Sequence, residues 1–140
     1  MKIAVKEVGK ELQIVETSQK YRTDCAKEYT GKEDRAEYVK LNNNGTLVIA
    51  VNENGLLHEM PTNFLLATTN PKYPIQKIVG TVAFIRTKYV NPWATEIEVE
   101  DLTFEDIQLI TDILSDEHQS YLQENFTDYG LGDATFFVFK

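Results

Sequence analysis

Residues 37–60 read Glu-Tyr-Val-Lys-Leu-Asn-Asn-Asn-Gly-Thr-Leu-Val-Ile-Ala-Val-Asn-Glu-Asn-Gly-Leu-Leu-His-Glu-Met. Two Asn-Gly pairs, Asn44-Gly45 and Asn54-Gly55, separate three runs that favour β-strands, 37–41, 46–51 and 56–60. Asn-Gly readily adopts the positive φ angles of tight hairpin turns, so the stretch predicts a three-strand antiparallel meander. The middle run is apolar on both faces, which predicts a strand buried on both sides.

Further strands are predicted on either side of this meander. The runs 2–8 and 11–16 flank Gly9-Lys10 and indicate an opening hairpin. Residues 75–87 indicate a long strand with a bulge or bend at Gly80. Residues 96–100 alternate acidic with apolar side chains, as an edge strand does. The tail 134–139 indicates a last strand.

One early helix is predicted over residues 18–29, behind an N-cap at Thr17 or Ser18 and ending near Gly31. Its inner stripe includes Cys25.

Two late, acidic helices follow. Thr103-x-x-Asp106 resembles a capping box that opens the first of them. The second covers about residues 116–125, with Tyr121 and Leu122 expected on its inner side. The chain is therefore predicted to be a single α+β domain over residues 1–140, with a mostly antiparallel sheet, a central three-strand meander, one early helix and two late acidic helices.

Composition narrows the class of protein. A chain of 140 residues with 42% hydrophobic content can bury the core of one globular domain. No apolar run approaches the roughly 20 residues of a membrane span. The single cysteine cannot close an intramolecular disulfide, so a cytoplasmic protein is expected. No catalytic signature or glycine-rich phosphate loop is present, so we expect a protein that is not an enzyme and uses no cofactor.

Charge is unevenly distributed along the chain. From Glu96 onward there are twelve acidic residues and one base, Lys140, whereas residues 1–95 hold ten acidic and thirteen basic residues. The formal net charge is -8. An acidic surface repels nucleic acid and attracts basic protein surfaces, so direct nucleic-acid binding is not expected.

This asymmetry suggests an acidic face that binds the basic surface of a partner, such as a nucleic-acid-binding protein, by imitating nucleic-acid phosphates. The predicted partner-binding residues are Glu96, Glu98, Glu100, Asp101, Glu105, Asp106, Asp112, Asp116 and Glu117. Two alternatives stay open. The cluster can be a solvated strand edge and helix start, where acidic residues favour the helix dipole. It can also bind a divalent metal, although no EF-hand spacing is present.

Aromatic residues elsewhere in the sequence leave two other functions open, ligand binding and oligomerisation. A pocket lined by Asn63, Phe64, Tyr73 and Trp93 would hold a small ligand such as a nucleotide, although core packing explains the same residues. Alternatively, the phenylalanine-rich tail from Asp128 onward would make the protein a homo-oligomer with a structural or regulatory role.

The remaining candidate side chains favour a structural reading. His58 is expected to be a partly buried strand residue, and Cys25 a small core residue. Two histidines (His58 and His118) and one cysteine, distant in sequence, do not readily form a zinc site, so no metal is expected. A Cys25–His58 nucleophile pair is the less favoured alternative.

Residues 48–63, Val-Ile-Ala-Val-Asn-Glu-Asn-Gly-Leu-Leu-His-Glu-Met-Pro-Thr-Asn, resemble the signature of a family of small domains of unknown function from phages, plasmids and conjugative elements of Gram-positive bacteria. That signature has an Asn-Glu-x-Gly turn followed by Leu-Pro-Pro-Asn-Arg. An Ile-x-Gly strand and a helix opened by Leu-Thr follow in the family, and 78–84 and 102–106 are similar to these.

The resemblance covers roughly residues 1–125, with two departures: Thr62 stands where the family has its second proline, and Phe64 replaces the arginine. It implies an accessory protein of a mobile element in the host cytoplasm. Such proteins often inhibit host defence, which implies that the basic partner is a host defence protein.

Overall fold

The computed structural model describes residues 1–69, 71, 72, 74–88, 93 and 96–126. Its centre is an antiparallel sheet in the order β2-β1-β7-β4-β3, with β8 paired to the end of β7. These strands are β1 (Lys2–Lys6), β2 (Gln13–Glu16), β3 (Ala36–Lys40), β4 (Leu47–Asn52), β7 (Val82–Thr87) and β8 (Val99–Glu100). A two-stranded sheet is formed by β5 (Thr62–Ala67) and β6 (Ile75–Val79).

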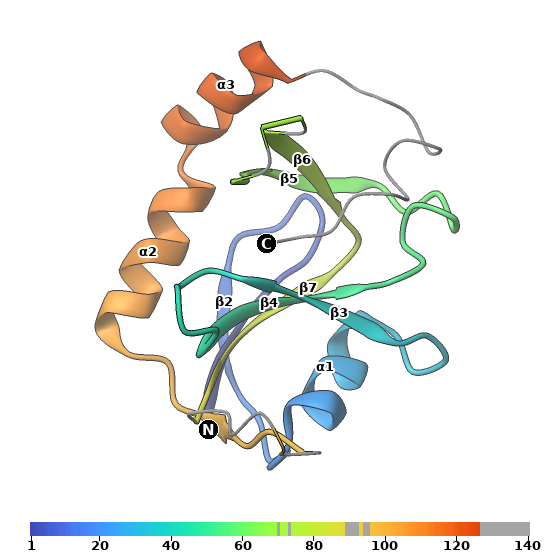
Figure 1. Cartoon of the computed structure of the whole chain (residues 1–140), viewed down its shortest axis with the longest axis vertical. Coiled ribbons are helices and arrows are strands. Elements are labelled where there is room, and N and C mark those ends of the chain that lie inside the picture. Colours follow the sequence, from blue (N-terminus) through green and yellow to red (C-terminus); the bar gives the residue numbers. More distant parts are fainter. Residues whose placement is uncertain (70, 73, 89–92, 94–95, 127–140) are drawn as a thin grey trace.

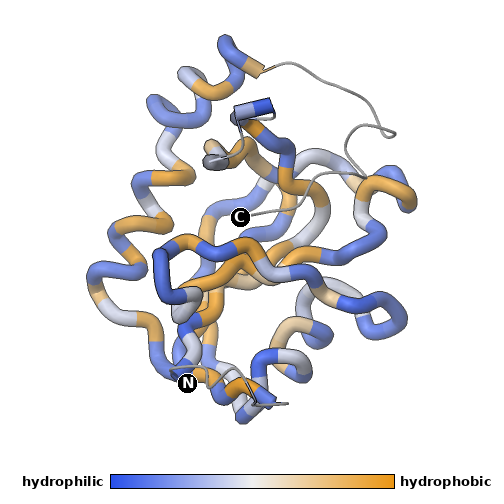
Figure 2. The backbone as a smooth tube through the Cα atoms, viewed as in Figure 1, coloured by the Kyte–Doolittle hydropathy of each residue, from blue (hydrophilic) through white to orange (hydrophobic). Residues whose placement is uncertain are grey.

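Both faces of the central sheet are covered (Figure 1). Helix α1 (Arg22–Thr30) packs Cys25 and Ala26 against one face. The other face carries the β5–β6 sheet and α2 (Phe104–Leu114), with Phe64 and Ile110 in its core and α3 (Asp116–Asn125) continuing beyond α2. Figure 2 shows apolar residues concentrated along the central strands and alternating with polar ones along α2. The predicted α+β class, with one early and two late helices, is confirmed.

The decisive stretch is only partly a meander. Strands β3 and β4 form the predicted hairpin, Gly45 has φ 72°, and every residue of β4 is buried. The predicted third strand at 56–60 is wrong, because the chain makes successive turns there and β4 pairs instead with β7. Gly55 does not adopt a positive φ, and Asn52 Oδ1 accepts a hydrogen bond from the Asn54 backbone (2.8 Å), which favours a compact turn.

The predicted long strand at 75–87 is two strands in different sheets. Gly80 separates β6 from β7. Its backbone φ is 73°, a value that residues with a side chain rarely adopt. A Cβ on Gly80 would also lie 2.8 Å from Met60 Sδ. The glycine therefore does more than bend a strand, since it lets the chain cross from one sheet to the other.

Smaller differences concern element ends. The opening hairpin is confirmed, but α1 begins at Arg22 behind Tyr21, which makes no side-chain cap. Thr17 is not the N-cap, and its hydroxyl accepts a hydrogen bond from Gln19 N (3.1 Å). Helix α1 ends at Gly31, as predicted. The strand predicted at 96–100 is reduced to β8, and the predicted strand at 134–139 lies outside the described residues.

The start of α2 is held by the predicted capping box and by an unpredicted ion pair. Thr103 Oγ1 accepts from Asp106 N (3.1 Å), while Asp106 Oδ2 accepts from Thr103 N (2.8 Å). The same carboxylate accepts two hydrogen bonds from Arg86 of β7, at 2.5 Å from Nε and 2.7 Å from the terminal nitrogen. Asp106 is only 4% exposed, so these bonds compensate a buried charge.

We expect Asp106→Asn to lower the free energy of unfolding by about 3 kcal/mol, because removing one partner of a buried pair leaves the other charge uncompensated. Urea denaturation measures this. Glu124→Gln, an amide substitution at an exposed site on α3, is the matched control and should stay within about 0.5 kcal/mol of the parent protein. Equal stability of the two variants would show that the pair contributes little.

The same carboxylate should make stability depend on pH. Burial opposes ionisation, but the hydrogen bonds from Arg86 and Thr103 outweigh it, so the pKa of Asp106 lies below its ordinary value of 3.8. Its stabilising contribution is therefore present above the unfolded-state pKa and is lost as pH falls through the lower folded-state pKa. Between about pH 5 and pH 3, Asp106→Asn should lose less unfolding free energy than the parent protein. Parallel pH profiles would contradict this assignment.

Candidate functional site: an acidic ridge on the late helices

Several of the predicted partner-binding carboxylates are already engaged inside the molecule. Asp106 is buried against Arg86, so it is not part of an exposed acidic face, a correction to the prediction. Asp101 Oδ1 accepts a hydrogen bond from Lys2 N (2.6 Å), which ties the segment before α2 to β1. Glu100 lies opposite Arg86 in the β7–β8 pairing and is half-buried.

Glu98 is neutralised by bases from earlier in the chain. Its carboxylate lies 3.3 Å from Lys88 Nζ and 3.4 Å from Lys20 Nζ. The hydrogen bond from Lys88, with its charge and that of Lys20, lowers the pKa of Glu98. The acidic strand therefore does not present a uniformly negative face. Of the predicted residues before α2, Glu96 and Asp101 are exposed.

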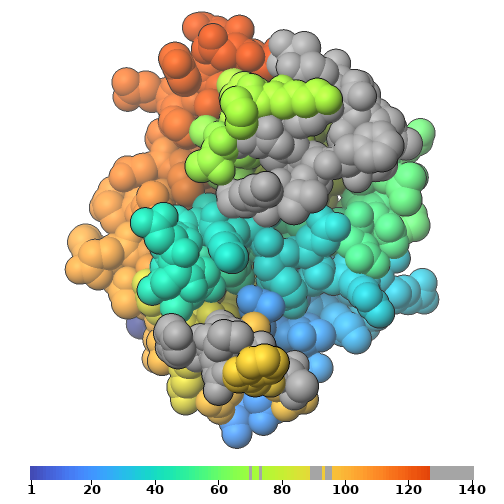
Figure 3. Space-filling view, in the orientation of Figure 1, coloured from blue at the N-terminus to red at the C-terminus, as the bar shows by residue number. Residues whose placement is uncertain are grey.

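The late helices carry a different arrangement, which we call the α2–α3 ridge. It consists of five exposed carboxylates, Glu105, Asp112, Asp116, Glu117 and Glu124. The sequence has no lysine or arginine between Lys88 and Lys140, and none of the five forms an ion pair within the described part of the chain. Helices α2 and α3 follow one another along one border of the molecule (Figures 1 and 3). Four of these residues were predicted, and Glu124 was not.

Large apolar side chains lie among these carboxylates. Phe104 is 77% exposed beside Glu105, and Tyr121 is 63% exposed between Glu117 and Glu124 at helical spacings of four and three residues. Exposed aromatic residues are over-represented among the energetic centres of protein interfaces. The ridge therefore combines charge that attracts a basic partner with side chains that a partner can bury.

The exposure of Tyr121 corrects its predicted inner position, whereas Leu122 is buried as predicted. Gln119 determines which side of α3 faces inward. Its amide accepts from Leu65 N (2.8 Å) and donates to Leu65 O (2.9 Å) and Ile113 O (2.8 Å). The inner face of α3 therefore runs through Gln119 and Leu122, and Tyr121 points elsewhere.

The alternative ligand pocket is not assembled as predicted. Phe64 is buried and stacks on Phe84 with ring centroids 6.0 Å apart. Trp93 is 88% exposed, and Tyr73 lies outside the described residues. Asn63 and Phe64 border the same hollow, whose lining does not include Trp93, so the described residues form only part of the predicted pocket.

Asn63 has a clear structural role. Its Nδ2 donates to Lys6 O and to Gly80 O, both at 2.8 Å, and its Oδ1 accepts from Lys6 Nζ (3.1 Å). The side chain thus joins β5 to β1 and to the crossing at Gly80.

Asn52 acts similarly at the end of β4. Its Nδ2 donates to Thr30 O (3.0 Å) and to Asp34 Oδ2 (3.1 Å), which joins the end of α1 to the turn after β4. A Cβ on Gly31 would approach this Nδ2 to 2.9 Å, and one on Gly55 would lie 2.7 Å from Val79 Cγ2. The residues that carry the family resemblance therefore include several that hold the two sheets and α1 together.

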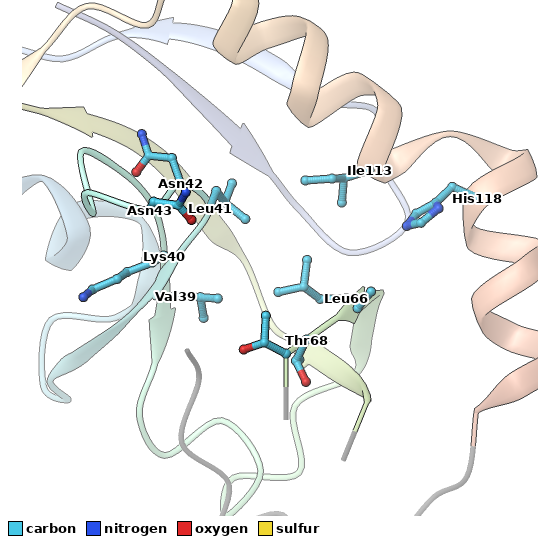
Figure 4. Close-up of a pocket in the computed structure, with 11 residues that line it drawn as sticks. Val39, Lys40, Leu41, Asn42, Asn43, Leu66, Thr68, Ile113 and His118 are labelled. Carbon is cyan, nitrogen blue, oxygen red and sulfur yellow. The ribbon is translucent and has the colours of Figure 1, made fainter. Parts of the chain in front are cut away.

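A hollow of ≈ 420 Å³ lies between the end of β3, the end of β5 and the start of α3. In Figure 4, Val39 and Leu41 lie opposite Leu66 and Ile113, and the side chain of Lys40 points away from the space between them. His118 borders this hollow.

The other candidate side chains do not form a reactive centre. Cys25 is buried as predicted, and burial, its largest influence, raises its pKa to about 11, which disfavours a thiolate nucleophile. His58 lies on an exposed turn instead of a partly buried strand, with Nε2 3.2 Å from Asp34 Oδ2. Over the described ranges, no group of three or more metal-ligating side chains occurs.

Comparisons of the chain with protein-family models, curated proteins and solved structures return no match. The resemblance to the mobile-element family therefore stays a prediction. Among the helices that the structure describes, none has the length and apolar character needed to cross a bilayer. The phenylalanine-rich tail proposed for oligomerisation lies outside the described residues.

We expect Asn63→Ala to lower the free energy of unfolding by about 3 kcal/mol, because it removes one acceptor and both donor contacts and leaves two partly buried backbone carbonyls without this partner. Chemical denaturation measures the effect. Asn43→Ala, at an exposed turn residue with no hydrogen bond to its side chain in the described structure, should change stability by less than about 0.5 kcal/mol. An Asn63→Ala variant as stable as the control would remove the structural explanation.

Proposed function

We propose that the protein is a non-enzymatic binding protein that docks its α2–α3 ridge onto a basic surface of a partner protein. The observation that carries this proposal is the set of five exposed carboxylates on two consecutive helices, none of which is in an ion pair in the described structure. Such a surface speeds encounter with a basic partner and rejects acidic ones.

The spacing of the charges bears on the kind of partner. Helices of 11 and 10 residues extend over about 30 Å at 1.5 Å per residue, so the ridge carries roughly one carboxylate per 6 Å. Duplex DNA carries one phosphate charge per about 1.7 Å of axis. The ridge is therefore several times less densely charged than DNA, which favours a basic protein surface over close imitation of a duplex.

The exposed aromatic residues support the same proposal. Exposed charge pairs contribute only about 0.2–1 kcal/mol each, so charge alone gives encounter and orientation but limited affinity. Burial of Phe104 and Tyr121 in a partner would supply the apolar part of the interface. If the resemblance to mobile-element proteins holds, the partner is a host protein, and inhibition of a host defence system is the proposed consequence.

A double charge reversal tests the ridge. Asp112→Lys with Glu124→Lys places lysines in the last turns of α2 and α3, where cations suit the helix dipole and folding should be preserved. With immobilised protein and a lysate of a Gram-positive host, we expect partner retention to fall at least about tenfold, equivalent to about 1.4 kcal/mol. Retention by the parent protein should also weaken between about 50 and 200 mM salt.

The matched control is Glu28→Lys with Glu33→Lys, which changes net charge equally at exposed sites in and just after α1. It should retain the partner within about twofold of the parent protein, because these residues lie away from the ridge. Equal losses in the two double variants would reject the ridge as the binding surface. Duplex DNA added as a competitor separates the two modes, since release of the partner by DNA indicates competition for a nucleic-acid-binding surface.

A further inference from the structure

A second hollow lies between the β1–β2 hairpin and the junction of α2 and α3, and it shares only Asp116 with the ridge. We call it the hairpin hollow, and its volume is ≈ 650 Å³. Figure 1 shows the hairpin loop rising between the late helices and the β5–β6 sheet. Leu12, Phe64 and Leu114 supply its apolar lining, and Lys6 and Lys10 are the cations that line it.

The ammonium group of Lys6 has no anionic partner in the described structure. Its Nζ donates to two neutral oxygens, Glu7 O (3.0 Å) and Asn63 Oδ1 (3.1 Å). An ammonium carries three donors, so one remains for a ligand. Partial burial lowers the pKa of Lys6, because no carboxylate compensates its charge. A lysine desolvated in this way gains stabilisation from an anion brought into the hollow.

Other polar groups of the hollow are already engaged. Thr111 Oγ1 donates to Ile107 O (2.8 Å), Ser115 Oγ donates to Asp112 O (2.9 Å), and the Gln119 amide is bound to Leu65 and Ile113. Lys10 Nζ is paired with Glu7 at 3.0 Å. Lys6 is therefore the donor most available to a ligand.

The charge and shape of the lining restrict the ligand. Asp116 and Glu11 also line the hollow, so a dianion such as phosphate would meet about twice the repulsion that a single negative charge meets. The apolar lining favours a ligand with an aliphatic body. We propose that the hairpin hollow binds a small monocarboxylate, with its carboxylate on Lys6 Nζ and its chain against Leu12, Phe64 and Leu114.

Three probes of equal chain length test this proposal on the unmodified full chain: hexanoate, 1-hexanol and hexylamine. Hexanoate should bind with a dissociation constant on the order of 1 mM, as expected for a ligand of so few atoms, and should shift the amide NMR resonances of Gly9, Leu12 and Leu114. Hexanol and hexylamine should bind at least about tenfold more weakly, because neither places a negative charge on Lys6.

Two lysine substitutions test whether the carboxylate of hexanoate lies on Lys6. Lys6→Gln removes the charge but keeps a donor for Asn63, and it should weaken hexanoate binding about tenfold. Lys10→Gln also removes a positive charge from the hollow, but this charge is already paired with Glu7. It should therefore change the affinity for hexanoate less than about twofold.

The proposal would be overturned if hexanoate did not bind, or if hexanol bound as tightly as hexanoate. It would also be overturned if inorganic phosphate, added as a fourth probe, bound more tightly than hexanoate, or if Lys6→Gln and Lys10→Gln lost equal affinity for hexanoate. The comparison of probes needs no substitution, so it decides the question even if Lys6→Gln fails to fold. Hexanoate binding by the ridge variant Asp112→Lys/Glu124→Lys would show that the hollow acts independently of the ridge.

Discussion

The buried contact between Arg86 and Asp106 fixes the position of α2, and with it the ridge. A carboxylate that is 4% exposed would be costly without compensation. Asp106 is compensated by two hydrogen bonds from Arg86 and by the capping box with Thr103. One side chain therefore both begins the helix and attaches it to a central strand. With this end of α2 fixed, Ile110 enters the core and the residues on the opposite side face solvent.

Two asparagine side chains set the rest of the architecture. Asn63 connects β5 to β1 and to the crossing at Gly80, and Asn52 connects the end of α1 to the turn after β4. Both use side-chain amides to satisfy backbone groups where the regular strand pairing stops, which is where buried polar groups most need partners. The two sheets are thus joined by specific hydrogen bonds as well as by apolar packing.

Local signals in the sequence predicted much of this fold. The Asn44-Gly45 hairpin and the capping box at Thr103 each depend on a few neighbouring residues, and each is present. The hairpin predicted at Asn54-Gly55 is absent. Asn52 accepts a hydrogen bond from the Asn54 backbone, and Val79 lies close to Gly55, so the chain forms a compact turn there instead. The Asn52 side chain is a local signal for such a turn, whereas the contact with Val79 comes from a distant strand that no local pattern shows.

The candidate site was less predictable than the fold, because charge in a sequence does not reveal which charges are paired. Arg86 lies 20 residues from Asp106, and Lys20 and Lys88 come from different segments from Glu98. Because these pairs neutralise Glu98 and Asp106, most of the exposed carboxylates without an ion pair in residues 96–126 lie on α2 and α3 and not on the predicted strand. Glu124 completes the ridge, and the absence of any base between Lys88 and Lys140 was the sequence signal that would have included it.

The amide of Gln119 has a consequence beyond orienting α3. By accepting from Leu65 N and donating to Leu65 O, it occupies the backbone groups that β5 would otherwise offer to another strand. Open strand edges invite pairing between molecules, and proteins commonly block them. Docking of α3 therefore blocks the edge of β5 at Leu65 against intermolecular β-pairing, so loosening of this helix would expose a backbone site for aggregation.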